Sequence, residues 1–495
     1  MQRRPAKRKK TEKKSPFSGY TLITLLIFFG ILVILLTASA SYVISQAKAT
    51  NFKIRQQKIL EIAEAGANYY RWHLAHVPDD FTDGTGGPGP YLHDYRDING
   101  NVIGKFSLNI VAPESGSTII TIESTGYLLD QPDLTTTVVL KMGIPSFSTY
   151  AVVANDKMRF GEGTEVWGPI HSNDGIRFDG LAHNIVSSAK DKYDDPDHGG
   201  SQEFGVHTHV PPQDPLPPQS VPARPDVFAA GRTFPVPPLD FNGITADLAI
   251  VKTKAIEGGI YLTSSGTQGY HVHFNVNHTV DIKKVTSQAY CRYRWYSWWY
   301  DYSDIWSIAT ETQFTYKGAS SLGIAVPSNG LIFIEDDVWV DGQIDNDKMT
   351  LVAAREPLAS ANANIIINND LKYTNHDESN VIGLIAQTNV AVGFYSEDDL
   401  EIDAALIAQK GAVTRFYYPN RSAYQQNPAH CADNVYRDIL TLYGAIATNQ
   451  RYGFAYTDGT GYNLRHLNFD PNLTYGPPPS FPTSGEYTII SWEEK

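Results

Sequence analysis

The chain has 495 residues, of which 42% are hydrophobic and 19% charged, and its formal net charge at pH 7 is −13. Its first 19 residues hold eight Lys or Arg and one Glu, a net charge of +7, so the rest of the chain carries −20. Such an acidic surface repels phosphates, which disfavours nucleic acid as a partner. The sequence also lacks a P-loop and a G-x-S-x-G motif, so neither nucleotide nor serine-hydrolase chemistry is supported.

The N-terminus joins a basic leader to an apolar segment. The leader runs from Met1 to Gly19, and the segment that follows, Tyr20 to Val43, carries no charge. About 20 apolar residues cross a bilayer as a helix, so this segment is long enough to do so. Basic flanks stay in the cytoplasm, which predicts a single-pass protein of the inner membrane whose remaining residues lie outside.

Three fates of this segment are open. The junction Ser18-Gly19-Tyr20-Thr21 resembles a type III signal, which prepilin peptidases cut on the cytoplasmic side, after a Gly that precedes an aromatic residue and an apolar helix. A secretory signal would instead be cut after Ala38-Ser39-Ala40. An uncut segment would be a plain membrane anchor. We favour cleavage between Gly19 and Tyr20, which retains the helix in the mature protein.

Thr24 departs from the pilin pattern that this resemblance implies. Pilins usually carry Glu at the fifth residue after the cut, and in this chain that residue is Thr24. In the family, the Glu is thought to pair with the N-terminal amine of a neighbouring subunit, because an unpaired charge in hydrocarbon is costly. The same loss is known among minor subunits at the tip of a pilus or pseudopilus. Thr24 therefore favours a tip subunit over a major pilin.

An amphipathic helix continues from the apolar segment. Apolar residues recur at spacings of three and four, as expected for one helix face, at Ile59, Ile62, Ala63, Gly66, Ala67 and Tyr70. Charged residues occupy the other face, and Pro78 stops the pattern. The predicted helix spans residues 20–75 and is about 80 Å long at roughly 1.5 Å per residue.

This helix carries a recognisable signature. Gln-Gln precedes Ala-Glu-Ala-Gly at Gln56, Gln57, Ala63, Glu64, Ala65 and Gly66. The block resembles the signature of PilX-type minor pilins and related pseudopilins. The resemblance implies other pilins or minor pilins and a prepilin peptidase as partners, and a place on the cell surface after assembly.

A small antiparallel sheet is predicted for residues 76–145. Asn99-Gly100 is a hairpin signal, and runs rich in Ile, Val and Thr follow at Phe106 to Val111, Thr118 to Thr125 and Thr135 to Met142. The run from Ile122 to Tyr127 is similar to the helix-packed strands of PilX-type proteins. The sheet is expected to pack against the helix.

Residues 146–495 are predicted to form a large all-β domain, so the fold class is mainly β. Short alternating runs suggest a parallel β-helix or a large sandwich. We favour a right-handed β-helix, because evenly spaced residues could line one coil at Ile332 to Ile344, another at Ile382 to Val392 and a third at Ile402 to Ala408. The domain also resembles a domain of unknown function found after PilX-type N-termini, at Gly168 to Ile176, Gly444 to Ala447 and Pro477 to Pro482.

Two insertions interrupt the strand pattern. Residues 191–238 are rich in Pro, Asp and Gly, which predicts an extended ordered loop or a flexible excursion. Residues 288–306 are rich in aromatic side chains, among them Tyr293, Trp295, Trp298, Trp299 and Trp306. These rings are candidates for stacking on a surface glycan or for burial against a partner. Alternatively, they cover one end of the domain or form a local hairpin, which is the reading we favour.

Cys291 and Cys431 are the only cysteines. Outside the cytoplasm they could form a disulfide, but the sequence does not show that they meet.

Histidines offer a second candidate chemistry. His207-Thr208-His209 and His271-Val272-His273 each place two imidazoles on one face of an extended chain, and His198 and His278 lie near them in sequence. A zinc site is conceivable. Pairs of this kind are mostly incidental, so we predict no metal and no cofactor.

We conclude that the sequence predicts a non-enzymatic minor pilin-like subunit with a large outward domain for assembly or adhesion. The alternative is an anchored or secreted β-helix protein that binds or cleaves polysaccharide. Asp336, Asp337, Asp341 and Asp345 would supply the carboxylates of such an enzyme if they share a groove beside the aromatic stretch. Scattered acids would favour a structural role.

Overall fold

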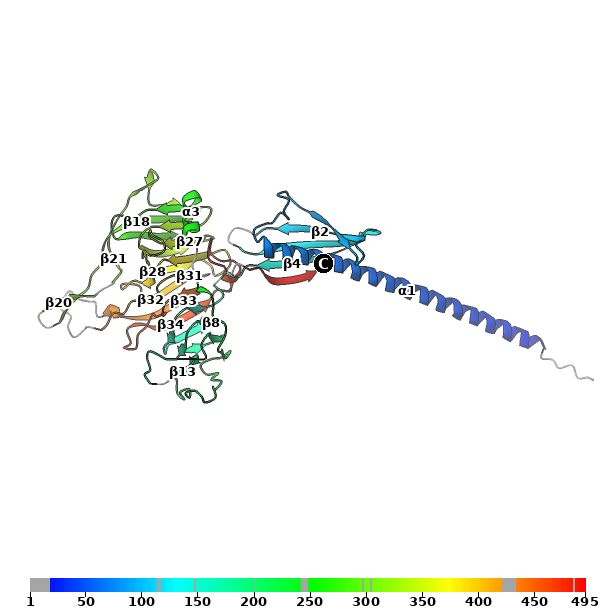
Figure 1. Ribbon diagram of the computed structural model, residues 1–495, viewed down its shortest axis with the longest axis horizontal. Coiled ribbons are helices and arrows are strands. Elements are labelled where there is room, and N and C mark those ends of the chain that lie inside the picture. Colours follow the sequence, from blue (N-terminus) through cyan, green and yellow to red (C-terminus); the bar gives the residue numbers. More distant parts are fainter. Residues whose placement is uncertain are drawn as a thin grey trace, which may run out of the picture.

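The computed structural model describes residues 18–113, 117–146, 148–200, 202–241, 248–295, 298–302, 305–420, 433–483 and 486–495. The fold is mainly β, with one long N-terminal helix. The helix packs on a small sheet, and a larger β-body lies beyond that sheet, on the side away from the helix N-terminus (Figure 1).

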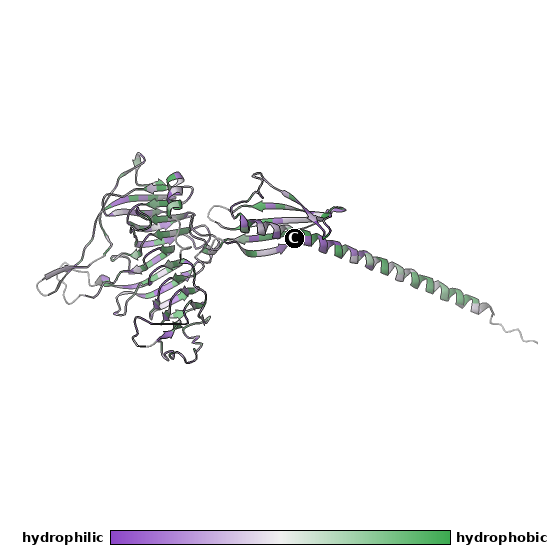
Figure 2. Ribbon diagram, viewed as in Figure 1, coloured by the Kyte–Doolittle hydropathy of each residue, from purple (hydrophilic) through white to green (hydrophobic). Residues whose placement is uncertain are grey.

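Helix α1 (Ser18–His76) has 59 residues and two different halves. Its N-terminal half is apolar and exposed along its length (Figure 2). Its C-terminal half buries a face completely, at Ile59, Ile62, Ala63, Ala67, Tyr70 and Leu74. These residues follow the spacing of the predicted apolar face, which is confirmed.

The small sheet is antiparallel, in the order β1-β2-β3-β4-β35. Its strands are β1 (Tyr91–Arg96), β2 (Val102–Val111), β3 (Ile120–Leu128), β4 (Gln131–Gly143) and β35 (Thr488–Glu494). Residues that point to the helix alternate along β3, as in any half-buried strand. Helix and sheet approach closely at Gly126, where a Cβ would lie 2.5 Å from the carbonyl oxygen of Ile59.

Strand β35 corrects the predicted domain boundary. The strand pattern predicts a large domain from residue 146 to the C-terminus, but β35 pairs with β4 from Thr488↔Gly143 to Glu494↔Val138. The larger body is therefore an insertion between the last two strands of the small sheet. The two connecting segments run together, and the Ser146 amide donates to the Thr474 carbonyl at 2.9 Å.

The larger body is built mainly from parallel ladders. One runs in the spatial order β15 (Arg232–Thr233), β11 (Val186–Ser188), β8 (Ile170–Ser172), β5 (Val152–Ala154), β33 (Tyr436–Thr448), β31 (Asp399–Ala408), β29 (Val381–Ala386), β27 (Lys348–Ala353), β25 (Leu331–Ile334) and β16 (Ile260–Leu262). A second joins β10 (Leu181–Ala182), β7 (Thr164–Trp167), β34 (Gly461–Phe469), β33, β31, β28 (Ile365–Tyr373), β26 (Val338–Ile344) and β17 (Gly269–Asn275). Shorter parallel ladders join β28 to β30 (Val390–Val392) and β32 (Val413–Arg415), and β6 (Met158–Phe160) to β9 (Ile176–Phe178) and β14 (Val206–His207).

The remaining described strands pair antiparallel. One group extends the second ladder beyond β17, and the others form separate two-stranded sheets. The antiparallel pairings are β12 (Lys192–Tyr193) with β13 (Glu203–Phe204), β18 (Thr279–Gln288) with β17, β21 (Ile308–Thr312) and β24 (Ile324–Ala325), β19 (Arg292–Trp295) with β20 (Trp298–Asp301), and β22 (Thr315–Tyr316) with β23 (Ala319–Ser320). Helix α3 (Leu248–Gly258), which no sequence pattern had indicated, covers β16 and β25. Among the described residues there are also two short 3₁₀ helices, η2 (Asp433–Val435) and η3 (Pro471–Thr474).

The chain enters the first ladder at its middle. Strands β5, β8, β11 and β15 run outward in sequence order, and the chain then resumes at the opposite end with β16. Strands β25, β27, β29, β31 and β33 return towards β5. Entry and exit therefore both lie near the middle of the stack, where the connection to the small sheet is seen (Figure 1).

A continuous apolar core fills the larger body. It contains each of the three evenly spaced sets expected from the sequence, which include Ile332, Leu384 and Leu406. The prediction that these sets point inward is confirmed. A second apolar layer lies outside the first ladder and includes Phe333, Ile385 and Phe481. Phe481 belongs to the Pro-rich motif at 477–482, and the neighbouring Pro479 carbonyl accepts a hydrogen bond from the Thr350 hydroxyl at 2.6 Å.

Candidate functional site

The exposed half of α1 is a long, uninterrupted apolar surface. By length and composition, α1 is the one helix among the described residues that could cross a membrane. The backbone of Gly19 already lies within the helix, and the Thr24 hydroxyl donates to the Tyr20 carbonyl at 2.9 Å. The first acidic residue after the leader is Glu61. The helix from Tyr20 to Leu60 therefore presents no side-chain carboxylate to a neighbouring subunit.

The helix signature divides into two sets of residues. Ala63 and Gly66 are buried against the sheet, whereas Gln56 and Gln57 are exposed; Glu64 and Ala65 are half-buried. A Cβ at Gly66 would lie 2.2 Å from Ser124 Oγ, so close packing explains that glycine. Gln56 and Gln57 are exposed, so packing against the sheet does not explain their presence in the signature.

The aromatic stretch forms a local hairpin. Strands β19 and β20 pair from Arg292↔Asp301 to Trp295↔Trp298. Trp298 is 72% exposed and Trp299 is 50% exposed, whereas Trp306 packs against Trp339 and Phe416. The side chains of Tyr293 and Trp295 lie outside the described residues. The hairpin thus offers two exposed indoles.

A disulfide lies at the base of this hairpin. Cys291 is disulfide-bonded and buried. Cys431, the other cysteine of the sequence, lies outside the described residues.

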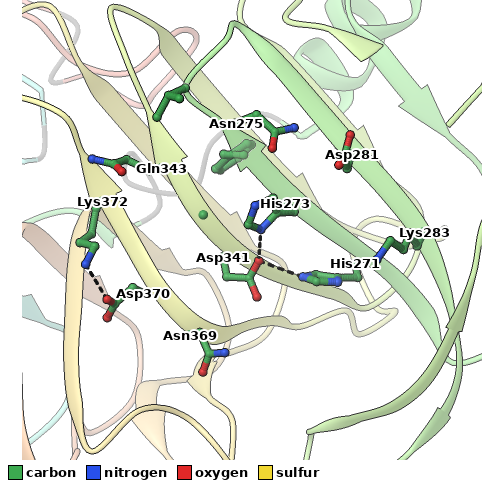
Figure 3. Close-up of a pocket in the computed structure, with 13 residues that line it drawn as sticks. His271, His273, Asn275, Asp281, Lys283, Asp341, Gln343, Asn369, Asp370 and Lys372 are labelled. Carbon is green, nitrogen blue, oxygen red and sulfur yellow. Dashed lines mark hydrogen bonds and ion pairs between the residues drawn. The ribbon is translucent and has the colours of Figure 1, made fainter. Parts of the chain in front are cut away.

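An open pocket of about 660 Å³ lies on the larger body, between β17, β18, β26 and β28 (Figure 3). Its most connected group is Asp341. Asp341 Oδ1 lies 3.0 Å from His271 Nε2 and 2.6 Å from His273 Nδ1, and the Asn368 amide donates to Oδ2 at 2.8 Å. The second HxH pair of the sequence therefore converges on one carboxylate.

The charges of this pocket are internally paired. Burial alone would lower the pKa of His271, but Asp341 and Glu311 outweigh it and raise that pKa. Burial opposes ionisation of Asp341, yet hydrogen bonds from both histidines hold its pKa well below the usual range. Asp370 accepts from Lys372 at 2.6 Å. Each of these carboxylates already has a protein partner.

The four acids proposed as a row do not share this pocket. Asp341 alone among them lines it. Asp336 and Asp337 are buried and bind Arg355, and Asp345 contacts Asn346. No described residue of the aromatic stretch lines the pocket. The row of acids beside aromatic rings that a polysaccharide enzyme would need is not formed by these residues.

The first HxH pair lies in a different setting. His207 and His209 come from the Pro-rich insertion, where they meet Asp195, His198 and Glu203. Burial, the Arg177 charge and neighbouring histidines lower the pKa of His209 to about 4. From the sequence this pair counted as incidental. The turn between β12 and β13, which brings His198 and Glu203 to His209, leaves no periodic signal in the sequence.

Comparisons with known proteins give little. No family model and no curated protein matches the chain. Among solved structures, the crystal structure of the competence-associated pilin ComZ from Thermus thermophilus aligns with 89% of this chain and 98% of its own, at 12% identity and a TM-score of 0.28. At this score and identity, the likeness does not establish a shared function.

Proposed function

We propose that this protein is a minor pilin-like subunit of a type IV pilus or pseudopilus. The observation that carries the proposal is the division of α1 into an exposed apolar half and a half packed on a small antiparallel sheet. Exposed apolar surface on this scale must be covered by lipid or by other helices. In a filament subunit this apolar half is covered by lipid while the subunit lies in the inner membrane. After assembly it is covered by the helices of other pilins.

Thr24 and the larger body support a place at the tip. Without a carboxylate near its start, the helix lacks the group that would pair with a neighbouring amine. The larger body lies beyond the sheet, at the end of the molecule opposite the apolar half (Figure 1). At the tip of a filament the larger body would face outward. Along a filament shaft, the larger bodies of successive subunits would crowd one another.

We also propose that the larger body is a right-handed parallel β-helix. Its stacked parallel ladders and the continuous core between them support this assignment. The body would act as a rigid display or assembly module. The paired carboxylates of the pocket favour a non-enzymatic role, because glycoside hydrolysis needs two carboxyl groups free to act as acid and as base or nucleophile.

The deciding experiment is intact mass and N-terminal sequencing of membrane-derived protein, co-expressed with an active or an inactive prepilin peptidase. A mature chain that starts at Tyr20 only with the active enzyme supports the proposal. A start at Ser41, or an uncut chain in both cases, would overturn it in favour of a secreted or simply anchored protein.

Surface glycan is a second candidate ligand, favoured by the exposed indoles of the hairpin. Trp rings stack on sugar faces with large contact area and little entropy cost. If glycan binds there, W298A and W299A should each reduce retention on immobilised polysaccharide about tenfold, whereas W167A should not. Trp167 is also exposed, but it stacks on His183.

A further inference from the structure

The Pro-rich insertion contains a cluster that the proposed function does not use. Its members, which we name the histidine cluster, are Asp195, His198, Glu203, His207 and His209. They come from the turn after β12, from β13 and from the segment that begins with β14. The cluster lies at the end of the larger body near β13 (Figure 1).

The ligand atoms of the cluster have metal-like spacing. Glu203 Oε1 lies 3.1 Å from His198 Nδ1 and 3.7 Å from His209 Nε2. Asp195 Oδ2 lies 3.5 Å from His207 Nε2. Bonds of about 2.0–2.2 Å to a tetrahedral ion put neighbouring ligand atoms roughly 3.3–3.6 Å apart. The ligand atoms of His198, Glu203 and His209 lie within 4.8 Å of one another, which leaves room for one ion between them.

The same atoms are buried without hydrogen-bond partners. Both carboxylate oxygens of Glu203 lack one, as do His207 Nε2, His209 Nε2 and His198 Nδ1. The Glu203 side chain is 1% exposed and that of His207 is fully buried. Burying a carboxylate is unfavourable unless a cation or hydrogen bonds compensate it. A cation bound between His198, Glu203 and His209 would compensate the Glu203 carboxylate and satisfy His198 Nδ1 and His209 Nε2.

Residues outside the histidine cluster fix the position of its histidines. The His209 amide donates to Asp179 at 2.9 Å, and the Thr208 amide donates to Asp214 at 3.0 Å. His207 Nδ1 lies 3.4 Å from the Tyr193 hydroxyl, so its other nitrogen points into the cluster. Outer contacts of this type fix the orientation of metal-binding histidines.

The second HxH pair serves as a contrast. Both nitrogens of His271 face carboxylates, at 2.8 Å to Glu311 and 3.0 Å to Asp341, and Asp341 is fully engaged. Those groups satisfy one another without an ion. Of the two HxH pairs, only the first has buried ring nitrogens without a hydrogen-bond partner.

We propose that the histidine cluster binds one divalent transition-metal ion of the zinc class. His198, Glu203 and His209 are its ligands, and His207, which forms a second group with His209 and Asp195, is a candidate for a fourth. Imidazole with a carboxylate suits Zn²⁺ and its neighbours, whereas Ca²⁺ and Mg²⁺ prefer all-oxygen sites. A neutral imidazole has one free nitrogen, so His209 can serve one ion and the expected stoichiometry is one per chain.

The test uses the full chain in detergent, without a polyhistidine tag, stripped with chelator and then dialysed against Zn²⁺ alone. Metal analysis should find one zinc per chain, and the wild-type melting temperature should rise by several degrees when zinc is added. Co²⁺ in its place should give the intense visible bands of a tetrahedral site.

Variants locate the ion. H209Q and E203Q should each weaken zinc binding at least tenfold, whereas H271Q, in the other HxH pair, should keep wild-type stoichiometry and affinity. Retention of zinc by H209Q and E203Q would overturn the proposal. If these variants do not fold, the wild-type chain decides: absence of stoichiometric zinc and of any thermal shift also overturns it.

Discussion

The two bodies of the molecule are stabilised in different ways. In the small one, a single helix face packs on one sheet, with contacts so close that a Cβ at Gly66, Gly104 or Gly126 would lie 2.2, 2.5 or 2.5 Å from a neighbouring atom. In the larger one, many short strands stack in parallel around a continuous core. The small body therefore depends on one interface, whereas stability in the larger body is spread along a stack.

The largest effect should come from G126V. Its side chain would collide with the Ile59 carbonyl oxygen and the Ala63 nitrogen, which are backbone atoms that cannot turn aside. We expect a loss of about 3 kcal/mol in the unfolding free energy of the small body. Hydrogen exchange should show faster exchange in β2, β3 and the C-terminal half of α1.

A matched control for this substitution is G87A. The nearest atom to a Cβ at Gly87 is 4.0 Å away, so exchange in the small body should be unchanged. Equal protection in G126V and wild type would show that the small body does not depend on this interface.

In the larger body, substitution of Asp403 should stabilise the fold, whereas G126V destabilises the small body. Burial raises the pKa of Asp403 from 3.8 to about 6. The folded state thus binds more protons than the unfolded state between these values, so this contribution to stability is present below pH 3.8 and is lost as pH rises through about 6. D403N should stabilise the larger body at pH 8 by about 2 kcal/mol, measured by denaturant unfolding.

Asp80 in the small body should behave in the reverse way. Hydrogen bonds, first from the Thr82 side chain and then from backbone amides and His73, hold the pKa of Asp80 below its usual range. Its contribution is present above pH 3.8 and is lost as pH falls further. D80N should therefore destabilise the small body at pH 7. If D403N and D80N both stabilised the protein, the opposite roles assigned to the two carboxyl groups would be wrong.

A smaller loss is expected from I382V in the core of the larger body. Ile382 is fully buried within the stack, and removing one methylene usually costs about 1 kcal/mol. Denaturant unfolding measures the loss, and hydrogen exchange should stay unchanged in the small body. Increased exchange in β2 and β3 would mean that the two bodies unfold together.

The smallest effect should come from R55A. Arg55 and Asp130 pair at 2.9 Å, but both side chains are largely exposed. An exposed pair of this kind contributes about 0.5 kcal/mol or less. Thermal melting should barely change, and a large shift would reveal an additional role for this end of the helix–sheet interface.

Much of the fold was predictable from local patterns. The apolar face of α1 follows from residue spacing, and the small meander from runs of β-branched residues and a hairpin turn. The inward sets around Ile332, Leu384 and Leu406 follow from alternation, since side chains of a strand point alternately to opposite faces. In the pocket, the pair His271 and His273 was predictable from its spacing. Its partner Asp341 was predicted only as one of four acids in a row with Asp336, and not as a neighbour of these histidines.

The sequence by itself determined helix α1 and the main strands, because each of these elements depends on residues a few positions apart, but it did not indicate α3. Only the tertiary structure decided which distant segments meet. It paired β35 with β4 across the whole larger body, separated Asp341 from Asp336 and Asp337, and brought His198 and Glu203 to His209. Contacts of this kind depend on how the chain turns between the elements, and such turns leave no periodic trace in the residues that they bring together.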